Sequence, residues 1–387
     1  MLKDVSFSGL NFTSTGRSFR QIVGRACANL TFTQCSWSAG DLPGMHVKLT
    51  DSLNTLFTRC KATRHAREVG SGSSWNSFMV GGGCHKATFD NCDFVGEMQT
   101  IDFTPNLFDT SADPGFNSLT SASTIQYMKI TNCTFTACND AGTSHPGSHY
   151  FEYLNNRIIG GSTGVRARSR TNIIKGNTIY TSRAGVALSA FCSNTTVEGN
   201  ECVQIPSSAG ILDSFYTGIS YSGVSSEINN GNFVENLTIN GNRVVVNTYN
   251  VNTSGILLTN NTPTFTDAQK VTLSFIVVSN NWIKITSIIA SNWVHGTKFF
   301  GNHFAGNTNR EAALWCQDNT GRNLILENTF DTAQPTAIAV KTGTCAPPAG
   351  APYPFNTVNR VSPQVGVYQT PNFALTNWTH TVTAAPA

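Results

Sequence analysis

The chain has 387 residues, of which 40% are hydrophobic and only 12% charged, and its formal net charge is +3. So small a charge does not indicate a nucleic-acid partner or binding to an anionic membrane surface, and no apolar run is long enough for a transmembrane helix. Thr, Ser, Asn and Gly take the place of Lys and Glu, which favours β-structure with many turns over helices. We therefore expect no nucleic acid, no membrane insertion and, in this sequence, no signal peptide.

A six-residue pattern recurs along the chain: an apolar residue, two small or polar residues, a fixed fourth residue, any residue, and a closing residue that is almost always apolar. The fourth position is occupied in turn by Leu10, Cys35, Cys60, Cys92, Cys133, Asn156, Asn177, Asn200, Asn242, Asn281, Asn302 and Asn328. Neighbouring copies lie 21 to 42 residues apart. Such a period, built from β-type segments and Gly turns, predicts a solenoid of about 12 coils, each with three short strands.

The fourth position is expected to be structural. An Asn that repeats in every coil can donate its amide to one neighbour and accept from the other, so a buried ladder satisfies its own polar groups. Cys in the early copies has similar bulk and needs no partner. The chain has 11 cysteines but no C-x-x-C pair, so we expect buried, reduced thiols, no metal site and no cofactor. Calcium is the alternative to no cofactor, and no ligand pattern in the sequence supports it.

The longer spacings predict inserted loops, taken here in chain order. The first runs from Gly70 to Gly83 and carries Trp75, and the second runs from Thr104 to Thr124. The third, from Ser214 to Phe233, carries Tyr216 and Tyr221, and the fourth runs from Thr259 to Lys270. Long insertions in a compact array are often functional. Trp75, Tyr216 and Tyr221 are predicted to stack on sugar rings, with subunit contacts as the alternative.

The repeat fades after Lys341, which predicts two parts: a parallel β-helix over 1–343 and a C-terminal linker with a capping or oligomerisation segment over 344–387. Repeat-like sequence begins at once, so the first coil would present unpaired strand edges. We expect a preceding anchor domain or a partner protein to cover them.

Outward-facing polar residues on adjacent coils form the candidate site. Val165 and Ala167 are expected to point inward, which turns Arg166 and Arg168 outward together. If Gly142 occupies the same register position as Gly164 on the next coil, then the register position of His145 is within one residue of those of the two arginines.

Asp140 belongs to the same coil as His145, and Asp102 lies one coil earlier. A basic residue beside a carboxylate and an arginine pair suits proton abstraction or acid-assisted cleavage on an acidic sugar. Asp102, Asp140, His145, Arg166 and Arg168 are therefore the predicted catalytic residues. The alternatives to a catalytic role are that Asp140 only stabilises a turn and that Arg166 and Arg168 only form a solvent-exposed face.

Glu152 and Asp213 are further candidate carboxylates, predicted to bind substrate. Glu152 is expected on the outside of a strand, and Asp213 occupies a position that is apolar in neighbouring coils, so it could instead anchor a loop. A glycosidase would use two such carboxylates, with their separation setting the stereochemistry.

The repeat with its asparagine ladder resembles the right-handed parallel β-helix of the pectate-lyase-like superfamily over about residues 4 to 340. That superfamily includes secreted polysaccharide lyases and hydrolases, alginate epimerases and trimeric bacteriophage tailspikes. The resemblance implies a tailspike-like homotrimer, in a virion tail or extracellular, that binds and cleaves bacterial surface polysaccharide. The alternatives are a secreted bacterial polysaccharide lyase, hydrolase or epimerase, and a non-catalytic structural or adhesive β-helix.

Overall fold

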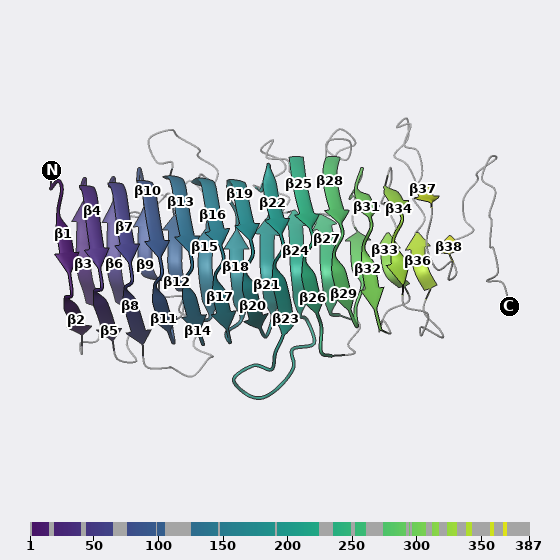
Figure 1. Cartoon of the computed structure of the whole chain (residues 1–387), viewed down its shortest axis with the longest axis horizontal. Coiled ribbons are helices and arrows are strands. Elements are labelled where there is room, and N and C mark those ends of the chain that lie inside the picture. The colour runs from purple at the N-terminus through teal and green to yellow at the C-terminus, as the bar shows by residue number, and fades with distance from the viewer. Residues whose placement is uncertain are drawn as a thin grey trace. The chain divides into compact units, whose positions relative to one another are not determined.

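The computed structural model describes the chain apart from residues 1, 15–18, 40–43, 65–75, 98, 105–124, 146–147, 190–191, 224–234, 249–251, 261–273, 292–293, 295, 307–311, 317–322, 331–337, 343–356, 360–366 and 370–387. Every regular element of the described part is a β-strand (Figure 1). No helix among the described residues is long and apolar enough to cross a membrane.

The chain divides into two compact units, which are described separately. Unit 1 comprises Met1–Ala187 and Ile205–Ile211, and unit 2 comprises Leu188–Gln204 and Leu212–Ala387. In both units the strands form three parallel sheets, here called A, B and C, and successive strands of the chain belong to A, B and C in turn. Each strand therefore pairs with the strand three places later in the chain, which is the connectivity of a solenoid.

The strands of unit 1 follow in chain order within each sheet. Sheet A contains β1 (Ser6–Ser8), β4 (Ala28–Thr33), β7 (Leu53–Thr58), β10 (His85–Asp90), β13 (Ile125–Thr131), β16 (Ser148–Leu154) and β19 (Arg170–Lys175). Sheet B contains β2 (Asn11–Ser14), β5 (Ser36–Ala39), β8 (Lys61–Arg64), β11 (Asp93–Val95), β14 (Thr134–Thr136), β17 (Arg157–Ile159) and β20 (Thr178–Thr181). Sheet C contains β3 (Phe19–Arg25), β6 (Gly44–Thr50), β9 (Asn76–Gly81), β12 (Gln99–Thr104), β15 (Asp140–Ser144), β18 (Thr163–Ala167) and β21 (Ala184–Ser189), the last two residues of which belong to unit 2.

Unit 2 continues the same rotation. Its sheet A contains β22 (Thr195–Glu198), β25 (Glu235–Asn240), β28 (Ser274–Ser279), β31 (Lys298–Phe300), β34 (Leu324–Leu326) and β37 (Thr357–Asn359). Sheet B contains β23 (Glu201–Gln204), β26 (Arg243–Val245), β29 (Trp282–Lys284), β32 (His303–Ala305) and β35 (Thr329–Phe330). Sheet C contains β24 (Thr217–Gly223), β27 (Ser254–Asn260), β30 (Ile288–Ser291), β33 (Ala312–Cys316), β36 (Ile338–Thr342) and β38 (Val367–Gln369).

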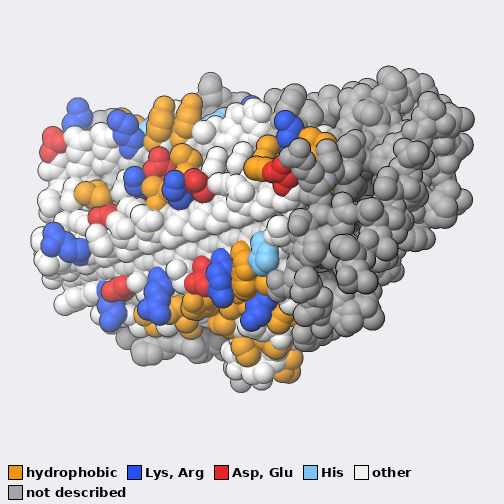
Figure 2. Space-filling model, turned by 45° about the vertical axis from the view of Figure 1, so that its right-hand side comes forward, with side chains coloured by type: hydrophobic (Ala, Val, Ile, Leu, Met, Phe, Trp, Pro, Cys, Tyr) orange, Lys and Arg blue, Asp and Glu red, His pale blue; other side chains and the backbone are white. Residues whose placement is uncertain are grey.

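The interior is built by like residues stacking on like from coil to coil. Phe32, Phe57 and Phe89 occupy the same register on β4, β7 and β10, are fully buried, and stack with ring centroids 4.8 and 4.5 Å apart. Because side chains alternate along each strand, the intervening residues face outward. On the face drawn in Figure 2, the charged side chains of the described residues lie in small groups separated by uncharged atoms, as the low charged fraction predicts.

The asparagine ladder is confirmed. Within unit 2, Asn242 Nδ2 donates to Asn281 Oδ1 at 2.9 Å, and Asn281 Nδ2 donates to Asn302 Oδ1 at 2.9 Å. Cys35, Cys60, Cys92 and Cys133 replace the asparagines in unit 1 and are buried, and all ten described cysteines are free thiols. The prediction of structural, reduced cysteines is thus confirmed for the described residues.

Asn242→Ala is expected to destabilise unit 2. Asn242 Oδ1 accepts from the backbone N–H and the Nδ2 of Asn200, at 2.9 and 3.0 Å, and its own Nδ2 donates to Val197 O at 3.0 Å. Leaving these buried groups unsatisfied should cost at least about 1–3 kcal/mol. Urea unfolding would measure the loss, with Thr238→Ala, half-buried on β25, as a control that should change little. An Asn242→Ala midpoint equal to the control would contradict the structural role of the ladder.

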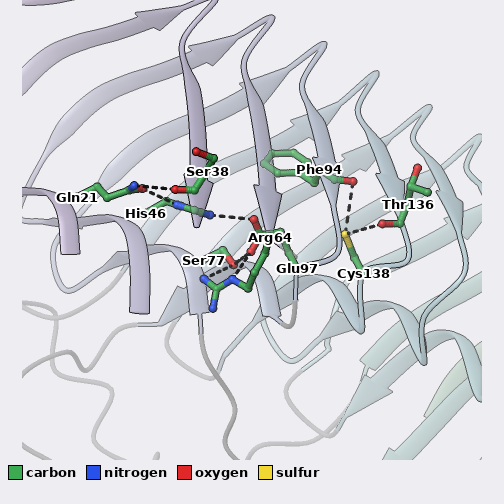
Figure 3. A network of polar contacts seen from close by, with 9 residues as sticks. All are labelled: Gln21, Ser38, His46, Arg64, Ser77, Phe94, Glu97, Thr136 and Cys138. Atoms are coloured by element: carbon green, nitrogen blue, oxygen red, sulfur yellow. Dashed lines mark hydrogen bonds and ion pairs between the residues drawn. The ribbon is translucent and has the colours of Figure 1, made fainter. Parts of the chain in front are cut away.

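The early coils of unit 1 enclose a polar cluster, here called the Glu97 cluster and drawn in Figure 3. Glu97 Oε1 lies 2.9 Å from His46 Nε2 and its Oε2 accepts from Arg64 Nε at 3.0 Å and from Ser77 Oγ. His46 Nδ1 lies 2.6 Å from Gln21 Oε1, whose amide nitrogen donates to Ser38 O at 3.1 Å. Both imidazole nitrogens therefore lie within hydrogen-bonding distance of side-chain oxygens.

His46 belongs to the interior of the coil although it is polar. Its side chain is fully buried, as is that of Glu97, and Arg64 is nearly so. His46 and Ser77 share one register position, directly before the inward-facing Val47 and Phe78. The two residues therefore lie where the chain turns from sheet B into sheet C, and the strict in–out alternation assumed for a straight strand does not hold there.

Candidate functional site

The outer face of sheet C in unit 1 brings together the polar residues singled out in the sequence. Asp102 on β12 pairs in register with Thr143 on β15, which pairs with Arg166 on β18. The preceding residues on β12 and β18, Ile101 and Val165, are fully buried, so Asp102 and Arg166 face away from the core. The two longest connections in unit 1, residues 65–75 and 105–124, both join a strand of sheet C. This face is therefore the one most associated with insertions.

Asp102 and His145 form the first pair of the site. His145 Nε2 lies 2.9 Å from Asp102 Oδ1, and the two side chains are 13% and 3% exposed. His145 directly follows β15, where its N–H donates to Phe103 O at 3.1 Å and its carbonyl accepts from Ser148 at 3.1 Å. The backbone thus fixes the histidine, and the nearly buried carboxylate faces its Nε2, which leaves the buried Nδ1 as the nitrogen that would have to exchange a proton.

Asp140 and Arg166 form the second pair. Arg166 Nη2 lies 3.3 Å from Asp140 Oδ2, and the side chains are 33% and 7% exposed. Burial raises the pKa of Asp140 above its usual range, although the charges of Arg166, Arg168 and Arg183 and a hydrogen bond from Thr163 act in the opposite direction. A raised pKa makes the protonated form of Asp140 easier to reach than that of an ordinary aspartate, which is a property that general acids need.

The raised pKa of Asp140 predicts the sign of a pH effect on stability. The protonated form is favoured in the folded state, so its contribution to stability is present below the unfolded pKa and is lost as pH rises through the folded pKa. Relative to Asp140→Asn, which does not titrate, the wild type should lose unfolding free energy over that interval. Denaturant titrations of both proteins at a series of acidic pH values measure the difference. A gain in stability with rising pH would show that the arginines outweigh burial.

In both the Asp102–His145 pair and the Asp140–Arg166 pair, a buried carboxylate contacts a more exposed basic side chain. Arg168 lies two residues beyond Arg166, and its N–H donates to Ser144 Oγ at 3.2 Å. Extending the register of β15 and β18 by two residues places Arg168 opposite His145 on the next coil, with the two backbones about 4.8 Å apart. The surface therefore presents an oriented imidazole beside guanidinium groups, an arrangement that can bind a carboxylate and move a proton near it.

The sequence analysis predicted this neighbourhood with one error of register. Asp102, Asp140, His145, Arg166 and Arg168 do lie on adjacent coils, and Val165 and Ala167 are buried as expected. Gly142, however, pairs with Val165 and not with Gly164. Both Ala141 and Gly142 face the interior where the chain turns into sheet C, which shifts the match by one residue. Thr163, which bonds Asp140, was missed because threonine is common throughout the chain.

The tyrosines were assigned wrongly. Tyr216 is fully buried and Tyr221 is 1% exposed, so neither can stack on a ligand from a loop. Tyr221 belongs to β24, whose Ile219 is also buried, and the insertion is therefore shorter than predicted. Phe78, expected in the first insertion, is likewise a core residue of β9. In each case small residues around a strand made it look like a loop.

The other predicted substrate-binding residues lie outside the cluster. Glu152 is on the outer face of sheet A, where it pairs with Lys129 at 3.1 Å. Asp213 accepts a hydrogen bond from Phe215 N at 2.8 Å, and its carbonyl accepts from Gln204, which is the geometry of a loop anchor. Trp75 lies outside the described residues. The described residues contain no group of three or more His, Cys, Asp or Glu side chains arranged to hold a metal ion.

Comparison with known proteins decides the fold. A family model described as a right-handed β-helix region matches residues 70–233. The chain is a right-handed parallel β-helix. No curated protein matches the sequence of this β-helix.

Solved structures similar to this β-helix include a mutant tailspike protein of the E. coli bacteriophage HK620, with 11% identity and a TM-score of 0.46 over 82% of this chain and 54% of that one. An alginate lyase from Paenibacillus has 9% identity and a TM-score of 0.29 over 85% of this chain and 92% of that one. The surface protein and adhesin PfbA of Streptococcus pneumoniae has 11% identity and a TM-score of 0.38 over 93% and 90%. The β-helix spans little more than half of the tailspike structure. At these identities the likeness concerns the fold alone.

Proposed function

We propose that this β-helix binds a bacterial surface polysaccharide and cleaves it at the outer face of sheet C in unit 1. The observation that supports the proposal most is the Asp102–His145 pair beside the Asp140–Arg166 pair. The low charge and the abundance of small polar residues fit a tailspike-like protein, acting as a homotrimer in a virion tail or outside the cell. In that setting we expect a further domain or partner to attach it.

The reaction that these residues suit best is β-elimination on a uronate-containing chain. Arg166, with Arg168 near it, would pair with the sugar carboxylate and stabilise the charge that develops when the neighbouring carbon loses its proton. His145, oriented by Asp102, would take that proton. The carbon–carbon double bond then forms as the glycosidic carbon–oxygen bond breaks, and the imidazolium proton is available to the leaving oxygen.

Glycoside hydrolysis is the second candidate, and the raised pKa of Asp140 favours it because a general acid must be protonated. Asp102 and Asp140 would then be the two carboxylates. Their engagement with His145 and Arg166 argues against this role, since a carboxylate already bonded to a base is poorly placed to activate water.

Product analysis separates these reactions. Purified protein would be incubated with a panel of acidic and neutral bacterial capsular polysaccharides, and shortening of the chains followed by size-exclusion chromatography. Elimination gives an unsaturated uronate that absorbs in the ultraviolet, whereas hydrolysis gives reducing ends without it. If the protein binds a polysaccharide but shortens none, the cleavage proposal fails and a non-catalytic adhesive role remains. Light scattering tests the trimer in the same preparation.

A further inference from the structure

A chain of buried hydrogen bonds lies at the corner where the chain passes from sheet C to sheet A, next to Arg168. Asn172 Nδ2 donates to Ser169 O at 2.6 Å, and Ser169 Oγ donates to Asn172 Oδ1. Ser169 Oγ also lies 2.7 Å from Ser144 Oγ, which accepts the N–H of Arg168 at 3.2 Å. The side chains of Ser144, Ser169 and Asn172 are fully buried and are here called the serine network.

The direction of each hydrogen bond follows from the donors present. The side-chain oxygen of Asn172 can only accept, so the hydroxyl proton of Ser169 is directed to it. The hydroxyl of Ser144 must then donate to Ser169 Oγ, while its oxygen accepts from the N–H of Arg168. The serine network is thus one continuous series of donors and acceptors that ends on the backbone of Arg168. Loss of either hydroxyl interrupts it.

Asn172 occupies a position that is apolar in the two preceding coils. On β19 it pairs in register with Phe151 of β16, which in turn pairs with Met128 of β13, and all three side chains are fully buried. An amide in such a position is unfavourable unless it is hydrogen-bonded. Asn172 therefore has a use that an apolar side chain could not provide, which is to anchor Ser169.

The corner at Arg168 is also built differently from its counterparts. In earlier coils Ala26 and Asp51 begin the two-residue connection from sheet C to sheet A, and each N–H donates to a main-chain carbonyl of the following coil, at 3.0 and 2.8 Å. Both residues have positive φ. Arg168 begins the equivalent connection after β18, and its N–H donates to the hydroxyl of Ser144 on the preceding coil. A side chain thus binds the backbone at this corner.

The serine network lies on the interior side of the candidate site. Ser144 immediately precedes His145, and Ser169 immediately follows Arg168. The bond between the two serine hydroxyls therefore joins adjacent coils at the residues next to the imidazole and the guanidinium group. The strands concerned, β15 and β18, are neighbours in sheet C (Figure 1). The serine network consequently fixes the separation of the two backbone segments from which these side chains project.

We infer that Ser144, Ser169 and Asn172 are positioning residues, which hold Arg168 relative to His145 so that both side chains meet the same sugar. This inference rests on the proposed function for the reaction, and it adds residues that act on that reaction without touching the substrate. Misplacing a positioned group by about 1 Å can lower a rate by up to about 10²-fold. Interrupting the serine network should therefore reduce cleavage while the fold is retained.

The test is a double-mutant cycle between Ser169→Ala and Arg168→Ala, with Ser52→Ala as the matched control. Ser52 is the buried serine at the same place in an earlier corner, where its hydroxyl donates to Thr50 O at 2.9 Å. Its loss should cost similar stability but leave kcat/KM on the cleaved polysaccharide within about twofold. Ser169→Ala should lower kcat/KM about tenfold. In the Arg168→Ala background the same change should have less than about a twofold effect, because no guanidinium group is left to position.

Unfolding curves show which variants fold, and Ser144→Ala enters the same cycle if Ser169→Ala does not. If wild type cleaves a polysaccharide and Ser169→Ala cleaves it equally well, the serine network does not position Arg168, although the cleavage proposal stands. Independent losses from Ser169→Ala and Arg168→Ala would overturn the inference in the same way. An equal loss in Ser52→Ala would reveal a general effect of stability and would also overturn it.

Failure of the proposed function gives a different pattern. If wild type binds an acidic capsular polysaccharide but cleaves none, the cleavage proposal fails and the cycle is measured on retention in affinity electrophoresis with that polysaccharide. Weaker retention of Ser169→Ala that disappears in the Arg168→Ala background would support the inference, and independent losses would contradict it. If wild type neither binds nor cleaves, the proposed function and the inference both fail.

Discussion

His145→Ala is expected to lower kcat on the cleaved polysaccharide by about 10²- to 10⁴-fold, the range typical of removing a positioned general base. The side chain is only 13% exposed and its Nε2 lies 2.9 Å from Asp102 Oδ1, so the imidazole is held in place and Nδ1 is the nitrogen that would take the proton. KM should change much less, because Arg166 would still bind the sugar carboxylate. Initial rates from ultraviolet absorbance over a range of substrate concentrations measure both constants.

Two further variants make this result specific. Asp102→Asn keeps the shape of the site but removes the charge that orients His145, so kcat should fall while polysaccharide binding remains. His303→Ala removes a histidine from β32 in unit 2, where it bonds Thr329 at 2.9 Å, and should leave activity unchanged. Equal activity of His145→Ala and wild type would exclude His145 as the base.

Glu97→Ala should cause the largest loss of stability of any single change considered, about 3–5 kcal/mol, because it removes the carboxylate that bonds the buried Arg64 and His46. His46 and Arg64 both bond the Glu97 carboxylate and neither has access to bulk water. Urea unfolding would measure the effect. Glu201→Ala is the matched control, since Glu201 bonds the half-exposed Arg243 and a surface pair contributes only about 0–1 kcal/mol. A loss for Glu97→Ala no larger than for this control would contradict the cluster's role.

The Glu97 cluster also predicts acid sensitivity. Burial raises the pKa of Glu97, but hydrogen bonding and charge from His46, the charge of Arg64 and the Ser77 hydroxyl outweigh it, so the pKa lies below its usual value. The stabilisation is therefore present above the unfolded pKa and is lost as pH falls through the folded pKa. Glu97→Gln should remove this part of the pH dependence, which paired unfolding curves between neutral and acidic pH would detect.

The fold was predictable from sequence because each coil repeats one structural requirement. Asn242 and Asn281 could be assigned to a ladder from spacing alone, since a buried amide needs identical neighbours above and below. Asp102, His145 and Arg166 could be brought together for the same reason: register between coils follows from the repeat.

The features that could not be predicted from the sequence lie where the chain turns from one sheet into the next, because the in–out alternation of side chains changes there. His46 and Glu97 come from different coils and meet only because the chain turns into sheet C with residues facing inward. Tyr221 was mistaken for a loop residue because β24 lies within a long connection.

The most direct test of the account is a crystal structure of the Asp102→Asn variant with an oligosaccharide from the cleaved polymer. The account predicts a sugar on the outer face of sheet C in unit 1, with its carboxylate within hydrogen-bonding distance of Arg166 and a ring carbon facing His145. An oligosaccharide bound only elsewhere, with Arg166 and His145 untouched, would contradict it.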